Sequence, residues 1–214
     1  MSGRKGNRAA DLGRKRGAAA YGRRGPVREP RATVLIVCEG ESTEPNYFRE
    51  LKRRARLANV NVVVKHGHGG STRGVVEHAI RLARQDDYDE IWCVVDTEIL
   101  STNITFASAV MLATSKGIRL AVSNPAFEYW YLLHLRDTNR AFASVEQLIT
   151  VLKSFLPEYE KSASYLPPIF AHTEAAISRA ETYRDRHVSP GDPYPHPSTN
   201  VYELVRLLRP TPLY

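Results

Sequence analysis

The fold of this chain is constrained most by four short apolar runs that alternate with segments of helical pattern in its 214-residue sequence. An apolar run without polar alternation is typical of a strand that is buried on both faces of a parallel sheet. The runs predict strands at 33–38, 60–64, 91–95 and 118–123. The segments between them predict helices from Glu44, with Thr43 as N-cap, from 73 to 84 and from 104 to 116. Such alternation favours right-handed crossovers, so we predict an α/β fold with a mainly parallel four-stranded sheet and flanking helices.

Downstream of this region the apolar pattern becomes helical. Four side chains at helical spacing predict a helix that begins near Pro125: Phe127, Trp130, Tyr131 and His134. Two pairs have the spacing of a capping box and predict helix starts: Ser144 with Gln147, and Asn200 with Glu203. A further helix is predicted over about 172–187, and the proline-rich segment 189–197 predicts a loop. We therefore expect a basic arm over 1–31, an α/β core over 32–136, and a helical extension over 137–214 that packs on the core.

The positive charge of the chain, +7 overall, is concentrated in the arm. The first 31 residues hold ten lysines and arginines against two acids, whereas the rest holds 20 basic and 21 acidic residues. The arm also has six of the 13 glycines and no sustained apolar period, so we expect it to be disordered when free. Basic arms of this kind bind polyanions, and a solubilising tail is the alternative. The nucleic-acid contacts expected here are Arg14, Lys15, Arg16, Arg23 and Arg24.

Acidic side chains follow two of the predicted strands. They are Glu39, Glu41 and Glu44 after the first strand, and Asp96 and Glu98 after the third. Sites of parallel sheets lie beyond the carboxyl ends of the strands, so these acids converge if the two strands are near neighbours. Clustered carboxylates without cysteine or histidine ligands favour Mg²⁺ or Mn²⁺ over zinc. The alternative is structural, because a helix dipole stabilises an acid such as Glu44 and strand ends often carry acids.

Three segments of the chain, in order, resemble the motifs of a known family. Residues 37–48, VCEGESTEPNYF, resemble the opening motif of the RloB family, and residues 123–130, SNPAFEYW, resemble its second motif. Residues 197–201, PSTNV, resemble its third motif, and the resemblance covers roughly 33–208. In addition, Glu39-Gly40 after one buried strand and Asp96-Thr97-Glu98 after another resemble the metal-binding Toprim fold of topoisomerases, primases and OLD-type nucleases.

The resemblance implies roles for the acids. Glu39 would be the Toprim glutamate, which holds a metal or transfers a proton, and Glu44 would be the second acid of the opening motif. Asp96 and Glu98 would be the pair that binds Mg²⁺ or Mn²⁺, with glutamate here where the family usually has a second aspartate. Glu39, Asp96 and Glu98 are then the expected catalytic residues, and Glu39, Glu44, Asp96 and Glu98 the expected metal ligands.

The function implied by the resemblance is a divalent-metal-dependent nuclease that hydrolyses DNA or RNA. It would act as an effector of bacterial anti-phage defence, with an ATPase encoded nearby as a partner. The alternative is a non-catalytic nucleic-acid-binding or regulatory Toprim-like module of a defence complex. A third reading, an enzyme that handles phosphoryl groups of small nucleotides, is disfavoured by the basic arm.

Other polar residues carry weaker signals. The loop with His66 and His68 is expected to be an exposed turn more than a phosphate contact, because it has no phosphate-loop motif. Glu128 is expected either to support a metal site or to be the buried partner of an arginine or of a backbone hydrogen-bond donor. The second, structural role is favoured slightly. His134 is expected to be a satisfied core histidine.

Some classes and compartments are disfavoured. The longest apolar runs have about six residues, too few to span a bilayer, and the basic N-terminal segment lacks the apolar stretch of a secretory signal. Cys38 and Cys93 lie within apolar runs and are expected to be reduced core thiols. We therefore expect a cytoplasmic protein without membrane contact, and the sequence leaves its oligomeric state open.

Overall fold

The computed structural model describes residues 32–57, 59–64, 71–97, 104–163 and 166–209. They contain one five-stranded sheet in the order β2-β1-β3-β4-β5. Its strands are β1 (Val34–Cys38), β2 (Val60–Val64), β3 (Glu90–Asp96), β4 (Arg119–Asn124) and β5 (Ser198–Thr199). The first four strands pair in parallel, which confirms the predicted sheet, and β5 pairs antiparallel with β4. The predicted count of four strands was too low, because a strand of two residues leaves no apolar pattern in a sequence.

The crossover helices of the sheet lie where the sequence predicts them: α1 (Thr43–Arg54), α2 (Thr72–Leu82) and α3 (Ile104–Ser115). The predicted N-cap of α1 is wrong by one position. Ser42 is the N-cap, without a side-chain capping bond, and Thr43 is already helical. At α2 the Ser71 hydroxyl does cap the helix, accepting a hydrogen bond from the Gly74 amide at 3.2 Å.

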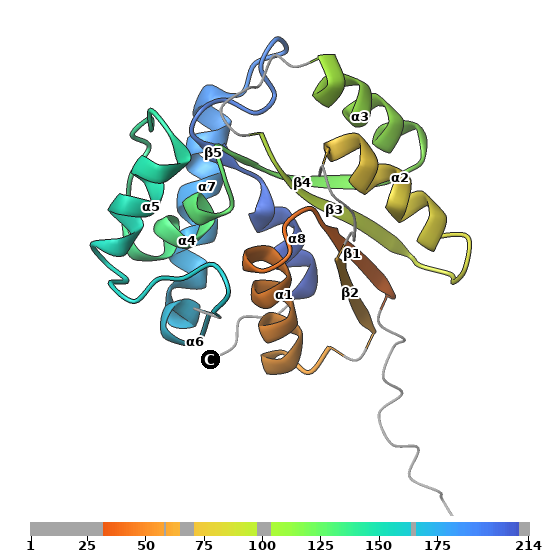
Figure 1. Cartoon of the computed structure of the whole chain (residues 1–214), viewed down its shortest axis with the longest axis horizontal. Helices are drawn as coiled ribbons and strands as arrows, with labels where there is room; N and C mark the ends of the chain where they lie inside the picture. The colour runs from red at the N-terminus through yellow and green to blue at the C-terminus, as the bar shows by residue number, and fades with distance from the viewer. Residues whose placement is uncertain (1–31, 58, 65–70, 98–103, 164–165, 210–214) are drawn as a thin grey trace, which may run out of the picture. The chain divides into compact units, whose positions relative to one another are not determined.

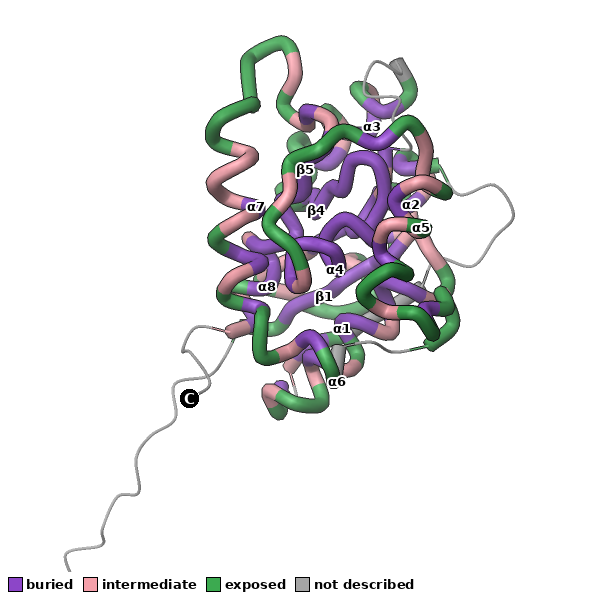
Figure 2. Tube along the Cα trace, turned by 90° about the vertical axis from the view of Figure 1, so that its left-hand side faces the viewer, coloured by how far each residue is buried: buried purple, intermediate pink, exposed green. Residues whose placement is uncertain are grey.

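The sheet divides the core into two halves, because alternate side chains of a strand point to opposite faces. On one face Val34, Ile36 and Cys38 pack with side chains of α1 and of two later helices, α4 (Glu128–Leu135) and α8 (Val201–Leu208). On the other face Leu35 and Val37 pack with side chains of α2 and α3. Figure 1 shows α2 and α3 on one side of the sheet and α1 and α8 on the other, and in Figure 2 β1 and β4 are buried along nearly their whole length.

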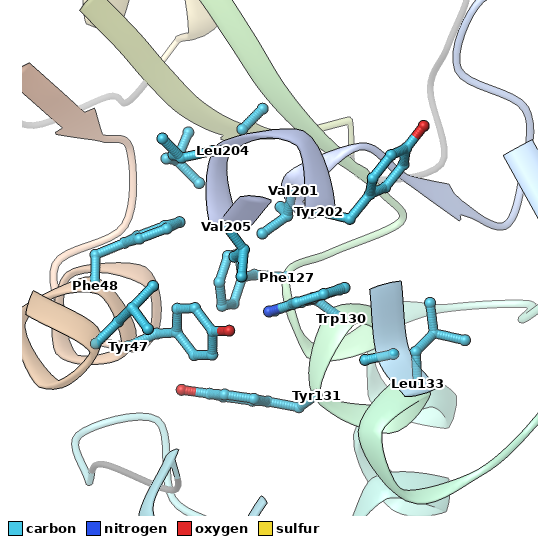
Figure 3. Packing of buried hydrophobic residues seen from close by; sticks show 14 of the residues in the cluster. Tyr47, Phe48, Phe127, Trp130, Tyr131, Leu133, Val201, Tyr202, Leu204 and Val205 are labelled. Atoms are coloured by element: carbon cyan, nitrogen blue, oxygen red, sulfur yellow. The ribbon is translucent and has the colours of Figure 1, made fainter. Parts of the chain in front are cut away.

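The helices after β4 complete the first of these two core halves. They are α4 (Glu128–Leu135), α5 (Val145–Lys153), α6 (Leu166–Ile169), the 3₁₀ turn η1 (Phe170–His172), α7 (Thr173–His187) and α8 (Val201–Leu208). Helix α4 begins three residues after Pro125 and is buried on every side over Glu128–His134, whereas the sequence predicted a single buried face. Figure 3 shows aromatic rings of α1 and α4 meeting side chains of α8, with Tyr47 and Phe127 packed edge to face at 5.5 Å.

The two predicted capping boxes have different outcomes. Ser144 caps α5 as predicted, its hydroxyl accepting a hydrogen bond from the Gln147 amide at 3.2 Å. Asn200 precedes α8, but its side chain makes no capping bond. Its amide group instead pairs with β4, donating to the Leu120 carbonyl at 2.9 Å and accepting from the Val122 amide at 2.6 Å. The predicted helix start is confirmed, because Asn200 is at the N-cap position of α8, but the predicted capping bond is absent because the side chain is used by backbone groups of β4 beyond the reach of the short β5.

The described residues between Arg31 and Tyr214 form one compact unit, in which β5 and α8 pack directly against β4. Cys38 and Cys93 are buried free thiols, as predicted. Among the residues that the structure describes, none of the helices has the length and apolar character needed to cross a membrane.

Candidate functional site

A polar cleft of about 520 Å³ lies at the carboxyl ends of β1 and β3. The two strands are direct neighbours, and the Glu39 amide continues their ladder by donating to the Val94 carbonyl at 3.0 Å. This pairing brings Glu39, which follows β1, and Asp96, the last residue of β3, to the same edge of the sheet. Five acids, one lysine and six hydroxyl residues line the cleft: Glu39, Glu41, Glu44, Asp96, Glu128, Lys161, Ser42, Thr43, Ser71, Thr72, Thr97 and Thr105.

Glu44 reaches back from the first turn of α1 to the loop that follows β1. Its Oε1 accepts a hydrogen bond from the Gly40 amide at 3.3 Å. A Cβ atom at position 40 would lie 2.3 Å from Glu44 Oε2, so the glycine is what allows this close approach. Burial raises the pKa of Glu44, the Gly40 bond opposes that rise, and repulsion from Glu128 adds to it.

Asp96 lines the cleft. The residue as a whole is partly exposed to solvent, but its Oδ1 is buried. This Oδ1 has no hydrogen-bond partner among the described residues. Burial raises the pKa of Asp96 well above its ordinary value, and repulsion from Glu44, Glu128 and Glu39 raises it further. The Phe127 amide, which donates to Asp96, opposes the rise. Asp96 is therefore an acid that an added positive charge would stabilise strongly.

Glu128 enters the cleft from the first turn of α4, with only 3% of its side chain exposed. The Tyr159 hydroxyl donates to Glu128 Oε1 at 2.9 Å, and Lys161 Nζ lies 3.5 Å from the same oxygen. The lysine side chain is 59% exposed, so the positive charge stands at the cleft mouth while the carboxylate is inside. Sequence reasoning weighed Glu128 but missed Tyr159 and Lys161, since nothing in their local pattern connects them to residues more than 30 positions earlier.

The structure brings together most, but not all, of the acids that the sequence singled out. Glu39, Glu44 and Asp96 meet in the cleft, and Glu41 lines its exposed rim. Glu98, the fourth predicted ligand, lies outside the described residues, as do His66 and His68. The predicted nucleic-acid contacts of the arm also lie outside them: Arg14, Lys15, Arg16, Arg23 and Arg24.

His134 is a core histidine, as predicted, but it is satisfied only in part, because its buried Nε2 has no hydrogen-bond partner among the described residues. It is buried in α4, and its Nδ1 pairs with the Trp130 carbonyl at 2.8 Å. Burial lowers the pKa of His134 to about 3, so its ring is neutral at physiological pH. The side chain is absent from the cleft lining and takes no part in the chemistry proposed below.

The donor set of the cleft suits a hard divalent cation only in part. Within the described ranges, no three histidine, cysteine, aspartate or glutamate side chains are grouped closely enough to hold one ion. Mg²⁺, however, is commonly held by one or two carboxylates together with waters and substrate phosphates. The carboxylates and hydroxyls of the lining and the unpartnered Asp96 Oδ1 fit that mode of binding, in which Asp96 would be the main protein ligand.

The parallel sheet with acids at its carboxyl edge defines a mixed α/β protein compatible with a Toprim-like fold. The family model described as RloB-like protein matches residues 34–208, which is most of the chain. The chain therefore belongs to the RloB-like protein family, as the three sequence motifs indicated. No curated protein matches the sequence.

Proposed function

We propose that this protein is a divalent-metal-dependent nuclease whose cleft hydrolyses phosphodiester bonds of DNA or RNA. The observation that supports the proposal most is the convergence of Glu39, Glu44, Asp96 and Glu128 on one cleft, where burial, and after it repulsion among the acids, raises the pKa of Asp96. Such an arrangement destabilises the metal-free protein at neutral pH, and a bound cation relieves it. Because acids that repel one another lower the stability of the folded protein, a polar surface alone does not account for their grouping in the cleft.

In the proposed mechanism Asp96 would hold the cation, with Glu44 beside it. When bound, the cation would orient the scissile phosphate and stabilise the charge on the attacking and leaving oxygens. Glu39 would complete the ligand set or take the proton of the attacking water. Lys161 stands at the cleft mouth, where its ammonium group would attract a phosphate, and Tyr159 would hold the Glu128 carboxylate in place.

Family membership supports a wider proposal about context. We place the nuclease in bacterial anti-phage defence, in the cytoplasm, with an ATPase encoded nearby as a partner. The alternative class, a non-catalytic nucleic-acid-binding module, shares the fold but requires no cleavage.

The test is a cleavage assay on end-labelled single- and double-stranded DNA and RNA, with Mg²⁺, with Mn²⁺ and with EDTA, in the presence and absence of the neighbouring gene product. We expect cleavage that requires the cation and that Asp96→Asn abolishes. Asp86→Asn, which removes an exposed acid outside the cleft, is the matched control and is expected to cleave like the native protein. Cation-independent cleavage, or equal cleavage by Asp96→Asn, contradicts the enzyme proposal; binding without cleavage supports the alternative.

A further inference from the structure

Helix α1 begins at the cleft and ends in a dense group of positive charges. The segment from residue 49 to residue 56 holds five basic residues and one acid: Arg49, Lys52, Arg53, Arg54 and Arg56 against Glu50. Arg49 and Arg53 are one helical turn apart and share a face, and Arg56 follows at the end of the helix. All three side chains are exposed, and Arg49 and Arg53 lie on the side of α1 opposite its buried residues. We name Arg49, Arg53 and Arg56 the α1 basic stripe.

The stripe begins five positions after Glu44, which lines the cleft from the first turn of α1. Asn46 precedes Arg49 by three positions, and its side-chain amide donates to the Ser162 carbonyl at 2.9 Å. Ser162 is the neighbour of Lys161, which lines the cleft. From Asn46 to Arg53 the helix rises about 10 Å, and Figure 1 shows α1 running away from the carboxyl edge of the sheet. The stripe therefore lies within about two helical turns of a segment that lines the cleft.

Arg56 occupies a backbone position that ordinarily favours glycine. Its φ is 52°, in the left-handed region, where a side chain is strained. The Leu57 amide bonds the Lys52 carbonyl at 3.0 Å and the Arg56 amide bonds the Arg53 carbonyl at 3.4 Å, the pattern of a Schellman helix end. The chain thus carries a long cationic side chain just after the end of α1, at a position where glycine is structurally easier.

One acid partly neutralises the stripe. Glu50 pairs with Arg53 at 2.6 Å and with Arg54 at 2.7 Å. The Arg53 guanidinium lowers the pKa of Glu50 to about 2, so this carboxylate stays ionised at neutral pH. Neither Arg49 nor Arg56 forms an ion pair with any acid of the described segments. The charge of the stripe is therefore available to an external anion.

We propose that the α1 basic stripe binds the phosphodiester backbone of the nucleic acid whose scissile phosphate lies in the cleft. Exposed arginines in a row match a chain of phosphates, and such contacts position a nucleic acid without reading its sequence. The inference rests on the proposed function and adds a binding surface on the folded unit, distinct from the N-terminal arm.

The test measures binding in EDTA, where cleavage is absent, with the full chain and fluorescent single- and double-stranded DNA and RNA at several salt concentrations. The stripe variant is Arg49→Gln with Arg53→Gln and Arg56→Gln. Its charge-matched control is Arg81→Gln with Arg84→Gln and Lys116→Gln, three exposed residues at the C-terminal ends of α2 and α3, on the other side of the sheet. We expect the stripe variant to lower the slope of log affinity against log salt by about 2 to 3, and the control to leave it unchanged.

Two single substitutions separate binding from folding. Arg56→Gly removes one charge while relieving the strained backbone, so we expect weaker binding together with an unchanged or higher melting temperature. Glu50→Gln frees Arg53 and Arg54, so we expect binding severalfold tighter than that of the native protein.

The outcomes separate the two proposals. If the native chain binds nucleic acid and the stripe variant binds with the same affinity and salt slope, the stripe proposal is wrong and the nuclease proposal stands. If the stripe and control variants lose affinity equally, net charge rather than this surface explains the loss, and the stripe proposal is also wrong. If the native chain binds none of the four nucleic acids at low salt, both proposals fail. A preference for one of the four identifies the substrate class.

Discussion

The carboxylate of Glu44 rests on the backbone of Gly40, with Oε1 accepting the Gly40 amide at 3.3 Å and with no room for a side chain between them. This contact joins the loop after β1 to the first turn of α1. It thereby holds two of the acids in the cleft, Glu39 and Glu44, in a fixed relation.

A methyl group at position 40 disrupts this contact. We expect Gly40→Ala to lower the free energy of unfolding by about 1–3 kcal/mol, because the buried Glu44 side chain must move aside. Chemical denaturation measures the change. Gly191→Ala is the control, since a Cβ there meets no atom within 4 Å and is expected to be nearly neutral. Equal stability of the two variants would show that Glu44 moves freely.

The acids of the cleft make the metal-free protein less stable as the pH rises. The pKa of Asp96 is raised in the folded state, so the folded protein binds its proton more tightly than the unfolded chain does. This contribution to stability is complete below the unfolded pKa, near 3.8, and is lost as the pH rises through the folded pKa. Glu44, whose pKa is also raised, acts in the same direction.

His134 acts in the opposite direction, because its folded pKa of about 3 lies below its ordinary value of 6.5 and its contribution is lost as the pH falls. Comparing the native protein with Asp96→Asn in EDTA cancels the histidine effect. We expect the melting temperature of Asp96→Asn to exceed that of the native protein increasingly between pH 4 and pH 8. Across this range the difference in melting temperature should grow by about 3 °C for each pH unit by which the folded-state pKa of Asp96 exceeds its ordinary value. A gap that is constant with pH would contradict the raised pKa.

The left-handed backbone conformation of Arg56 predicts an effect on stability that is independent of binding. Glycine adopts the left-handed conformation at this helix end without strain, so we expect Arg56→Gly to raise the free energy of unfolding by up to about 1 kcal/mol. Urea denaturation measures it, with Arg56→Ala as the comparison, since alanine keeps the strain and removes the charge. If the glycine variant is no more stable than the alanine variant, the backbone at position 56 is not strained.

Asn200 replaces a missing stretch of strand beside β4. Its side chain satisfies the Leu120 carbonyl and the Val122 amide, both buried within the edge of the sheet. We expect Asn200→Ala to destabilise the protein by about 2 kcal/mol or more, because two backbone groups lose their partners. Asn139→Ala, at an exposed position, serves as the control in the same thermal unfolding series. If Asn200→Ala loses no more stability than the control, water can satisfy these two backbone groups in place of Asn200.

The sequence alone predicted the parallel strands, their helices and the edge where Glu39, Glu44 and Asp96 meet. These features follow from local apolar patterns and from a general rule for parallel sheets. It did not predict β5, the role of Asn200 or the partners of Glu128. Each of these depends on contacts between segments far apart in the chain, such as Glu128 with Tyr159, and such contacts leave no local pattern.

The central claim is that the cleft carboxylates form a divalent-cation site, and direct measurement of cation binding tests it best. Isothermal titration of the native protein with Mn²⁺ should show saturable binding that competes with Mg²⁺. Asp96→Asn should weaken that binding at least tenfold, while Asp86→Asn, which alters an exposed acid outside the cleft, should leave it unchanged. Absence of saturable binding by the native protein, or equal affinity in Asp96→Asn, would contradict the account.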